Sequence, residues 1–404
     1  MTADWAAIRR RLAVRRTANR PPWSGRQAGH GSIVAPLAAT IAASVAVGVG
    51  VVALAQAERA RRSAKAQRAR DRRFVQLPGE PLEEGLRRMA LGQLALAIEL
   101  LSGDGNGDRK GGRKSGGKDD WKGGKNASNE RAVHETRKAL KRLRALLRLL
   151  RGTLGERRFA HEYEILRDAA QRLAGARDAE VMVGTLDALL ERQPRKLARR
   201  RAVIELRKLL VAQRASAIQR TLGDRATRRE VLCELTGLRE RAQLWNLPQR
   251  PGITIVESDL RRVYRKGRRH HRHAGRAAGQ SVIGGRGKTS TRALHEWRKR
   301  VKDLRYAAEM LGLRPLARRA DVLGELLGEE HDLALLAALL PAPGRAPFKG
   351  KRGKQTRKTL LKQIARRRRR LRKRALSEGK RLYRRSPKQF ARRVRRAHAR
   401  AARL

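Results

Sequence analysis

The sequence predicts an all-α fold made of two pseudo-symmetric helical bundles, and three observations carry this prediction. Apolar residues recur at helical spacing over most of the chain from about residue 80 onward. No segment alternates for long enough to indicate a half-buried strand, apart from the short stretch 253–256. Finally, a helical segment near residue 134 is repeated near residue 295, and we infer that the two copies belong to bundles related by a pseudo-twofold axis.

The composition indicates a polyanionic partner. The 404 residues include 99 Lys and Arg against 37 Asp and Glu, which gives a formal net charge of +62. Such an excess is self-repelling unless nucleic acid, an anionic membrane surface or a phosphate polymer lies close. Aromatic residues are only 3% of the chain, which argues against single-strand binding by base stacking. The single cysteine, Cys233, excludes an intrachain disulfide, and we expect it in the core.

The N-terminal region is expected to lie outside the folded domain. Residues 1–32 are read as a disordered basic arm, and residues 56–79 as a charged helical connector. Between them, residues 33–55 carry no charge and are long enough to span a bilayer, so we expect a single transmembrane helix there. An Ala-rich soluble helix and a cleaved signal ending near Ala57 are the alternatives. Arginines flank the run on both sides, so the positive-inside rule gives no clear orientation.

The remaining elements follow from residue 81 to the end. A first helix ends in a Gly-, Lys- and Asp-rich stretch, 103–129, which is expected to be a flexible loop. A second Gly-rich loop is expected at 279–289. One expected helix contains His134 and another contains His295. Further helices are expected at about 157–174, 177–193, 257–277, 315–328 and 331–340. Longer basic helices are expected to fill roughly 195–246, and a final pair of helices is expected from about 355 to the end.

Both repeated helices carry a basic stripe. His, Arg, Lys and Arg fall at positions i, i+3, i+7 and i+10 in each copy, which places them on one helix face. An apolar stripe lies one residue out of phase, so each helix has a core face with a cationic face beside it. We expect the paired stripes to hold a multiply charged anion. The residues are His134, Arg137, Lys141 and Arg144 in the first copy and His295, Arg298, Lys302 and Arg305 in the second.

The repeat continues beyond these helices. The run from Arg177-Asp178 is similar to the run from His331-Asp332, and each is expected to open a helix. In that position Asp178 and Asp332 act as caps or as favourable charges at the helix N-terminus.

These motifs together resemble the CHAD domain family. The resemblance rests on the doubled H-x-x-R-K-x-x-K-x-[LV]-R pattern and on the two helix starts, and covers roughly residues 80–400, with repeat halves of about 80–250 and 251–400. Tyr264-Arg265-Lys266-Gly267-Arg268-Arg269 and Gly379-Lys380-Arg381-Leu382-Tyr383 are similar to the family too. The resemblance implies binding of inorganic polyphosphate by a basic surface along or between the two bundles. Carried over to this sequence, the implied ligand set is His134, Arg137, Lys138, Lys141, Arg142, Arg144, Arg148, Arg265, Arg268, His295, Arg298, Lys299, Lys302 and Arg305.

No catalytic, metal or cofactor motif accompanies these stripes. The sequence has no Glu-x-Glu-x-Lys strand of the triphosphatases that some relatives carry, and no carboxylate pair is placed for acid–base chemistry. His270, His271 and His273 are interpreted as part of a basic patch, because only two of them share a helix face. We therefore expect a protein that is not an enzyme.

The function expected from the sequence is non-catalytic polyphosphate binding in a bacterial protein. The protein is expected to tether polyphosphate or its granules at a membrane, with the basic domain cytoplasmic and possible contact with anionic lipid; a cytoplasmic granule-associated protein is the alternative location. Binding is expected to tighten below neutrality, because phosphates favour charged histidines. The alternatives are a general nucleic-acid-binding protein, with duplex DNA otherwise only a nonspecific competitor, or a regulatory subunit of polyphosphate metabolism.

Overall fold

Every regular element in the described part of the chain is an α-helix, which confirms the all-α prediction. The computed structural model describes residues 74–103, 118–173, 175–192, 195–223, 225–249, 252–280 and 287–401, all within one compact unit. The predicted arm, the predicted transmembrane helix at 33–55 and the connector up to residue 73 lie outside these residues. Within the described ranges, no helix combines the length and apolarity that a bilayer crossing requires.

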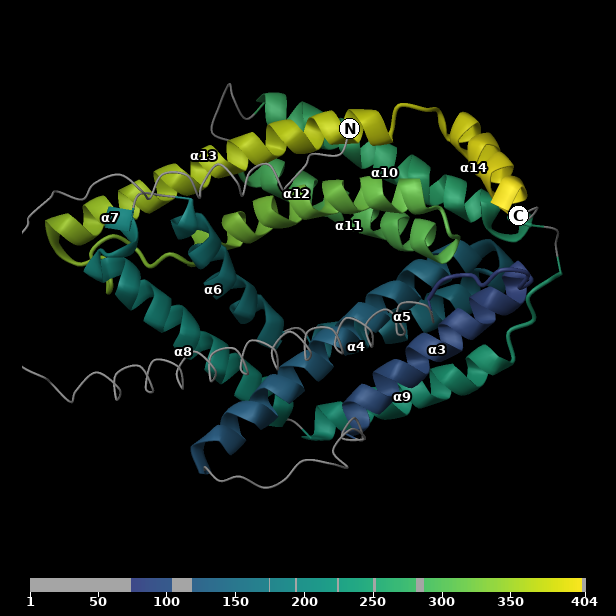
Figure 1. Ribbon diagram of the computed structural model, residues 1–404, viewed down its shortest axis with the longest axis horizontal. Coiled ribbons are helices and arrows are strands. Elements are labelled where there is room, and N and C mark those ends of the chain that lie inside the picture. Colours follow the sequence, from purple (N-terminus) through teal and green to yellow (C-terminus); the bar gives the residue numbers. More distant parts are fainter. Residues whose placement is uncertain are drawn as a thin grey trace, which may run out of the picture. The chain divides into compact units, whose positions relative to one another are not determined.

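The first cluster of helices is built on α3 (Leu82–Ser102) and α4 (Lys118–Leu154). Helix α3 packs on α4 and α9 (Arg225–Gln243), and α5 (Glu156–Arg172) packs on α4 and α9 (Figure 1). The predicted apolar stripe of α4 is buried, since Leu140, Leu143, Leu147 and Leu150 are at most 1% exposed. Burial of such leucines contributes about 1.5–3 kcal/mol each and fixes the face that α4 turns to the core.

The second cluster has the same plan of contacts. Helix α11 (Gly287–Met310) packs on α10 (Thr254–Gln280) and α12 (Arg314–Leu339). Helix α13 (Gly350–Leu382) packs on α12, and α14 (Pro387–Ala401) packs on α10. By their contacts α10, α11, α13 and α14 correspond to α3, α4, α8 and α9.

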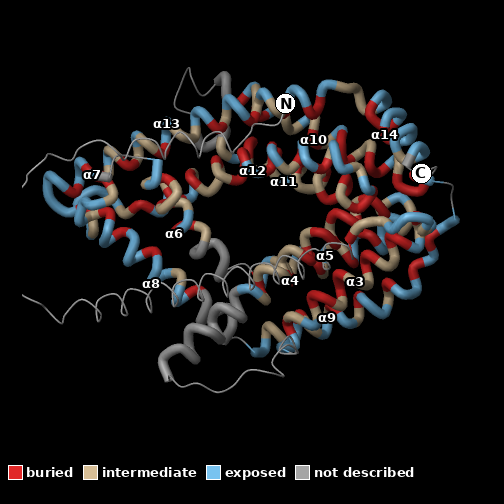
Figure 2. The backbone as a smooth tube through the Cα atoms, in the orientation of Figure 1, coloured by how far each residue is buried: buried red, intermediate tan, exposed pale blue. Residues whose placement is uncertain are grey.

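Two sets of contacts join the clusters. Helix α4 packs on α10 and α11, while α6 (Gly175–Glu191) packs on both α8 (Arg201–Gly223) and α12. The four-residue helix α7 (Arg195–Ala198) connects α6 with α8. Figure 2 shows buried segments on the inner faces of the helices of both clusters and exposed segments on their outer faces. The basic helices α4 and α11 thus lie where the two halves meet.

The largest correction concerns α12. The sequence predicted two helices, 315–328 and 331–340, with Asp332 near the start of the second, but α12 is continuous and Asp332 lies in its interior. A single interior glycine weakens a helix by only about 1 kcal/mol and does not have to end it. Gly328 is buried beside Arg298, and a Cβ there would lie 3.6 Å from Nη2 of Arg298. Asp332 therefore cannot act as a helix cap.

Three smaller predictions were also wrong. Helix α4 begins at Lys118, inside the predicted loop 103–129, since extending an established helix costs little. The end of the predicted connector, 74–79, forms turns, with Pro78 lacking an N–H and Gly79 at φ 73°. Cys233 is exposed, because α9 turns Val231, Leu235 and Leu238 to the core instead. Residues 254–256, considered as a strand, form the first turn of α10.

Candidate anion-binding surface

The two basic stripes lie on helices that contact each other. Helices α4 and α11 pack together, and all eight stripe residues are half-buried, at the border between the core and the solvent. This position follows from the sequence, because each stripe is one residue out of phase with a fully buried apolar stripe. A half-buried cation keeps its charge in a partly desolvated setting, which strengthens its attraction for an anion.

In α4 the stripe residues contact the end and the middle of α5. Arg137 Nη1 donates to the carbonyl oxygen of Leu173 at 2.6 Å, and thereby satisfies a group at the C-terminus of α5. Arg144 Nη2 donates to the hydroxyl of Tyr163 at 3.0 Å. His134 Nε2 lies 3.9 Å from Glu135, and its side chain is 40% exposed.

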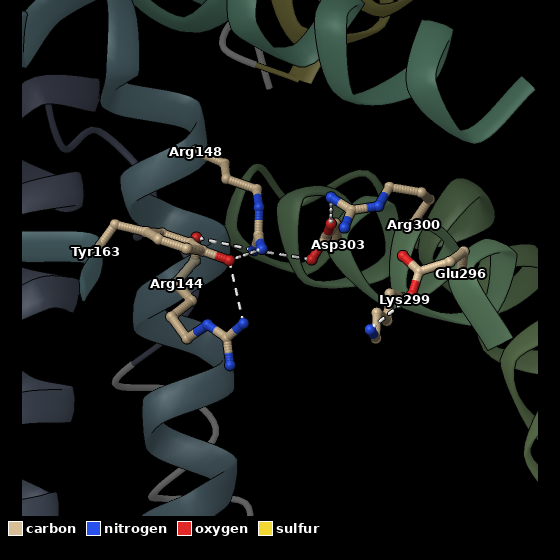
Figure 3. A network of polar contacts seen from close by, with 7 residues as sticks. All are labelled: Arg144, Arg148, Tyr163, Glu296, Lys299, Arg300 and Asp303. Carbon is tan, nitrogen blue, oxygen red and sulfur yellow. Dashed lines mark hydrogen bonds and ion pairs between the residues drawn. The ribbon is translucent and has the colours of Figure 1, made fainter. Parts of the chain in front are cut away.

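Arg148 connects the two halves of the molecule (Figure 3). Its Nη1 donates to Asp303 of α11 at 2.9 Å, and its Nη2 donates to the Tyr163 hydroxyl. Arg300 donates to the other Asp303 oxygen at 3.0 Å. Burial lowers the pKa of Arg148, while the Asp303 carboxylate opposes that shift. Arg148, which the family resemblance placed among the ligands, is thus already paired across the α4–α11 contact.

In α11 the stripe divides into two parts. Arg305 Nε donates to Glu309 at 2.7 Å, and its Nη1 lies 2.5 Å from Asp321, so two carboxylates neutralise it. Arg298 and Lys302 instead line a pocket of about 690 Å³ between α6, α11, α12 and α13. Gly184, Gly324 and Gly328 also line this pocket, and they have no side chains to fill the space beside the two cations.

The pocket has an excess of positive charge. Five cationic and three acidic residues line it, and the acids are partly engaged: Arg367 donates to both Glu329 oxygens at 2.6 and 2.7 Å, and Arg192 lies 3.4 Å from Glu329. The hydrogen bond from Arg367 lowers the pKa of Glu329. Sequence reasoning missed Arg192, Arg367 and Arg374, because nothing in their spacing separates them from the many other arginines.

Two histidines face each other beside this pocket. The rings of His295 and His331 are 4.3 Å apart between centroids. Burial is the main cause that lowers the pKa of His295, and neighbouring Lys299 and Arg298 add to it. Burial, followed by His295 and the surrounding cations, lowers the pKa of His331 to about 4. His331 is therefore neutral at neutral pH, and protonation of both histidines is disfavoured in the free protein.

The other predicted ligands lie in varied settings. Lys138 is 3.7 Å from Glu135, and Lys299 is 2.7 Å from Glu296. Arg142 is only 6% exposed, with its guanidinium 4.8 Å from the centre of the Phe74 ring, which is a position for packing. Arg268 Nε donates to the carbonyl oxygen of Tyr383 at 3.2 Å, whereas Arg265 is exposed.

The glycines of the two family-like motifs, Gly267 and Gly379, are tightly packed against aromatic side chains. A Cβ on Gly267 would lie 2.4 Å from the Tyr383 hydroxyl, and a Cβ on Gly379 would lie 2.5 Å from the Trp297 ring. The half-buried His271 lies against the same Trp297 ring, at 5.0 Å between centroids. These motifs therefore hold α10, α11 and α13 together. Within the described residues, no group of three or more His, Cys, Asp or Glu lies close enough to hold a metal ion.

The chain is similar to several known proteins. The family model of the CHAD domain matches residues 119–341. Two proteins of Mycobacterium tuberculosis, from strains CDC 1551 / Oshkosh and ATCC 25618 / H37Rv and both described as uncharacterized, are each 32% identical over 213 residues. The match covers 50% of this chain but only 38% of theirs. The crystal structure of the CHAD domain from the plant Ricinus communis matches with a TM-score of 0.44 and 18% identity, over 73% of this chain and 90% of that one.

The family model extends from the start of α4 to just beyond the end of α12, which is more than half of the chain. It includes both basic stripes, the Arg148–Asp303 contact and the His295–His331 pair. This protein belongs to the CHAD domain family.

Proposed function

We propose that the protein binds inorganic polyphosphate, without catalysis, along the paired basic faces of α4 and α11. One observation carries the proposal: two copies of the same cationic stripe lie on helices that contact each other, and the second copy opens into a cationic pocket. CHAD domains are linked to polyphosphate binding, which adds support from the family.

The chemistry of the surface suits a flexible polyanion. Polyphosphate carries close to one negative charge per phosphate, and guanidinium and ammonium groups bind its oxygens without requiring one fixed geometry. Such binding releases counterions and weakens steeply with salt. We propose Arg137, Lys141 and Arg144 of α4 as ligands. On the other side, the proposed ligands are Arg298 and Lys302 of α11 with Arg192 and Arg374, which line the pocket.

Base recognition has less support than phosphate recognition. The aromatic side chains assigned a burial class are buried or, in the case of Tyr163, half-buried, so they offer no platform on which bases stack. A phosphate backbone remains a possible competitor for the cations, and duplex DNA is therefore proposed only as a nonspecific competitor. A regulatory subunit of polyphosphate metabolism is the alternative role for the same surface.

The location is part of the proposal. We propose that residues 33–55 anchor the chain in a membrane, that the basic domain is cytoplasmic, and that the two halves act as pseudo-symmetric bundles around one polyphosphate chain. The protein would then tether polyphosphate or its granules at the membrane. Association with granules in the cytoplasm, without an anchor, is the alternative.

The test compares two variants of the full chain with equal charge. Arg298→Ala with Lys302→Ala removes two pocket cations, whereas Arg366→Ala with Arg370→Ala removes two exposed cations from α13. Titration with long-chain polyphosphate at near-physiological salt, with duplex DNA as competitor, should show a loss of about tenfold or more only in the pocket variant. Equal losses, or ready displacement by DNA at equal phosphate concentration, would reduce the protein to a diffuse polycation.

A further inference from the structure

A second basic cavity lies away from the paired stripes. It has a volume of about 1570 Å³ and is formed by α8, the residues just before it, and the first turns of α13. We call it the α8–α13 basin. Its cationic residues are Arg200, Arg201, Lys208, Lys349, Lys351, Arg352, Lys354 and Lys358. None of them lines the pocket at Arg298, so the two sites are separate.

The positive charge of the basin is almost uncompensated. Glu205 is the one carboxylate in the lining, and it lies 3.2 Å from Lys208. Among the described residues, the other seven cations of the basin have no ion pair, and Arg200 Nη1 donates to Thr356 at 3.3 Å. The N-terminus of α13 adds to this field, because its N-cap Lys349 makes no side-chain capping bond and the first backbone N–H groups lack helical partners. The basin is therefore attractive to phosphate groups.

The basin also presents aliphatic surface to the solvent. Ala202, Leu209, Ala212 and Pro347 form part of its lining, and Leu209 is 40% exposed. Along one edge of α8, Ile204 and Val211 are 45% and 42% exposed and lie two turns apart on the same face. Ile204 and Val211 lie about 140–160° round the helix axis from Leu209, so the apolar surface of the basin itself comes from Leu209 with Ala202, Ala212 and Pro347. This apolar surface beside a ring of cations favours a ligand that is both anionic and apolar.

We propose that the α8–α13 basin docks on the surface of an anionic phospholipid bilayer. In this arrangement Leu209 enters the boundary between headgroups and acyl chains, while the lysines of α13 bind lipid phosphates. Juxtaposed basic and aliphatic side chains are the combination that holds a helix at an anionic membrane interface. A fully hydrated polyanion would gain nothing from the aliphatic residues. The polyphosphate surface uses other residues, so both ligands bind at the same time.

The experiment is flotation of the full chain with vesicles of phosphatidylcholine, with and without phosphatidylglycerol. The basin variant carries Lys349, Lys351, Lys354 and Lys358 changed to Ala. The control variant carries Arg366, Arg369, Arg370 and Lys373 changed to Ala, which removes the same charge from the exposed face of α13. Residues 1–73 are identical in every variant, so binding that they contribute cancels. Circular dichroism confirms that each variant folds.

The basin variant should lose about tenfold or more of the extra binding that phosphatidylglycerol provides, and the control variant much less. Equal losses in the two variants would overturn the proposal, because they would show attraction by net charge alone. A parallel loss of polyphosphate affinity in the basin variant would also overturn it, since the basin would then belong to the polyphosphate surface.

A third variant separates the apolar contribution. Leu209→Ser leaves the charge unchanged. The unaltered chain should keep part of its phosphatidylglycerol-dependent binding in high salt, because buried aliphatic area is not screened, whereas the Leu209→Ser variant should lose that part. Salt resistance that is the same in both chains would contradict the insertion of α8.

Discussion

Helices α4 and α11 carry the same sequence pattern but lie in different electrostatic surroundings. Counted along the repeat, Arg142 of α4 corresponds to Asp303 of α11, and Arg148 corresponds to Glu309. In α4 the C-terminal part of the stripe is therefore cationic, with Arg144 and Arg148 over the ring of Tyr163. In α11 the equivalent part is neutralised, since Arg305 is held by Glu309 and Asp321.

The middle parts of the two stripes differ in the opposite sense. Arg298 and Lys302 of α11 open into the pocket that α6 covers, whereas Arg137 of α4 is bonded to the end of α5. One copy therefore presents its middle to a ligand, and the other uses Arg148 to bind its partner helix. Equivalent positions in a repeat thus need not have equivalent roles, because the neighbouring helices decide which charges stay available.

The largest effect is expected from removing the polar contact between α4 and α11. Asp303→Ala leaves Arg148 and Arg300 without their shared carboxylate, and Arg148 is largely buried. We expect a loss of about 3 kcal/mol in the free energy of unfolding, measured with denaturant. The double variant Asp303→Leu with Arg148→Met should recover much of that loss. A stable Asp303→Ala protein would show that the copies are held together by apolar packing alone.

The second prediction compares the two stripes as ligands. Arg298→Ala with Lys302→Ala should weaken polyphosphate binding by about tenfold or more, since both cations line the pocket. Arg137→Ala with Lys141→Ala should weaken it less, because Arg137 is already engaged with Leu173. Titration calorimetry of the two variants at one salt concentration measures the difference. Equal losses would mean that the two stripes contribute alike despite their surroundings.

The third prediction concerns the pair formed by His295 of α11 and His331 of α12. The folded-state pKa of His331 is about 4, below the value of about 6.5 of an unfolded chain. The unfolded state then binds more protons between these values, so stability rises with pH across that window and is lost as the pH falls through it. His331→Gln should flatten this dependence, by a few degrees in Tm. An unchanged Tm profile would exclude a buried neutral His331.

The same pair modifies the expected pH dependence of binding. Phosphates beside His295 would raise its lowered pKa, so binding takes up protons and tightens as the pH falls. Because burial depresses the pKa of the free state, this tightening should continue below the usual titration range of histidine before it levels off. Affinity that is flat from mildly acidic to mildly basic pH would contradict a role of His295 in binding.

The smallest effect on polyphosphate affinity is expected for Arg305, in the neutralised part of the α11 stripe. Arg305→Ala should change polyphosphate affinity by less than about twofold, because Glu309 and Asp321 already neutralise the guanidinium. The corresponding Arg144→Ala should have a larger effect, since the Arg144 guanidinium donates to the neutral Tyr163 hydroxyl and not to a carboxylate. Competition with a labelled polyphosphate resolves such a difference. A tenfold loss in Arg305→Ala would show that the ligand displaces these carboxylates.

Sequence periodicity was sufficient to predict the helices and the faces they bury. Leu140, Leu143, Leu147 and Leu150 of α4 are in the core as their spacing indicated, and all eight stripe residues lie at its border. Periodicity was misleading between 328 and 331, where the sequence was divided into two helices but α12 is continuous. Gly328 lies inside α12 and packs beside Arg298, a contact between residues 30 positions apart that no local pattern contains.

The amino-acid sequence by itself determined the helical class, the repeat and the excess of positive charge, since these follow from local spacing and composition. Only the tertiary structure decided which cations are available to a ligand. In a chain with 99 Lys and Arg, the difference between Arg148, paired with Asp303, and Arg298, lining a pocket, depends on which carboxylate the fold brings near. Those carboxylates come from distant segments, and electrostatic energy depends on distance in space.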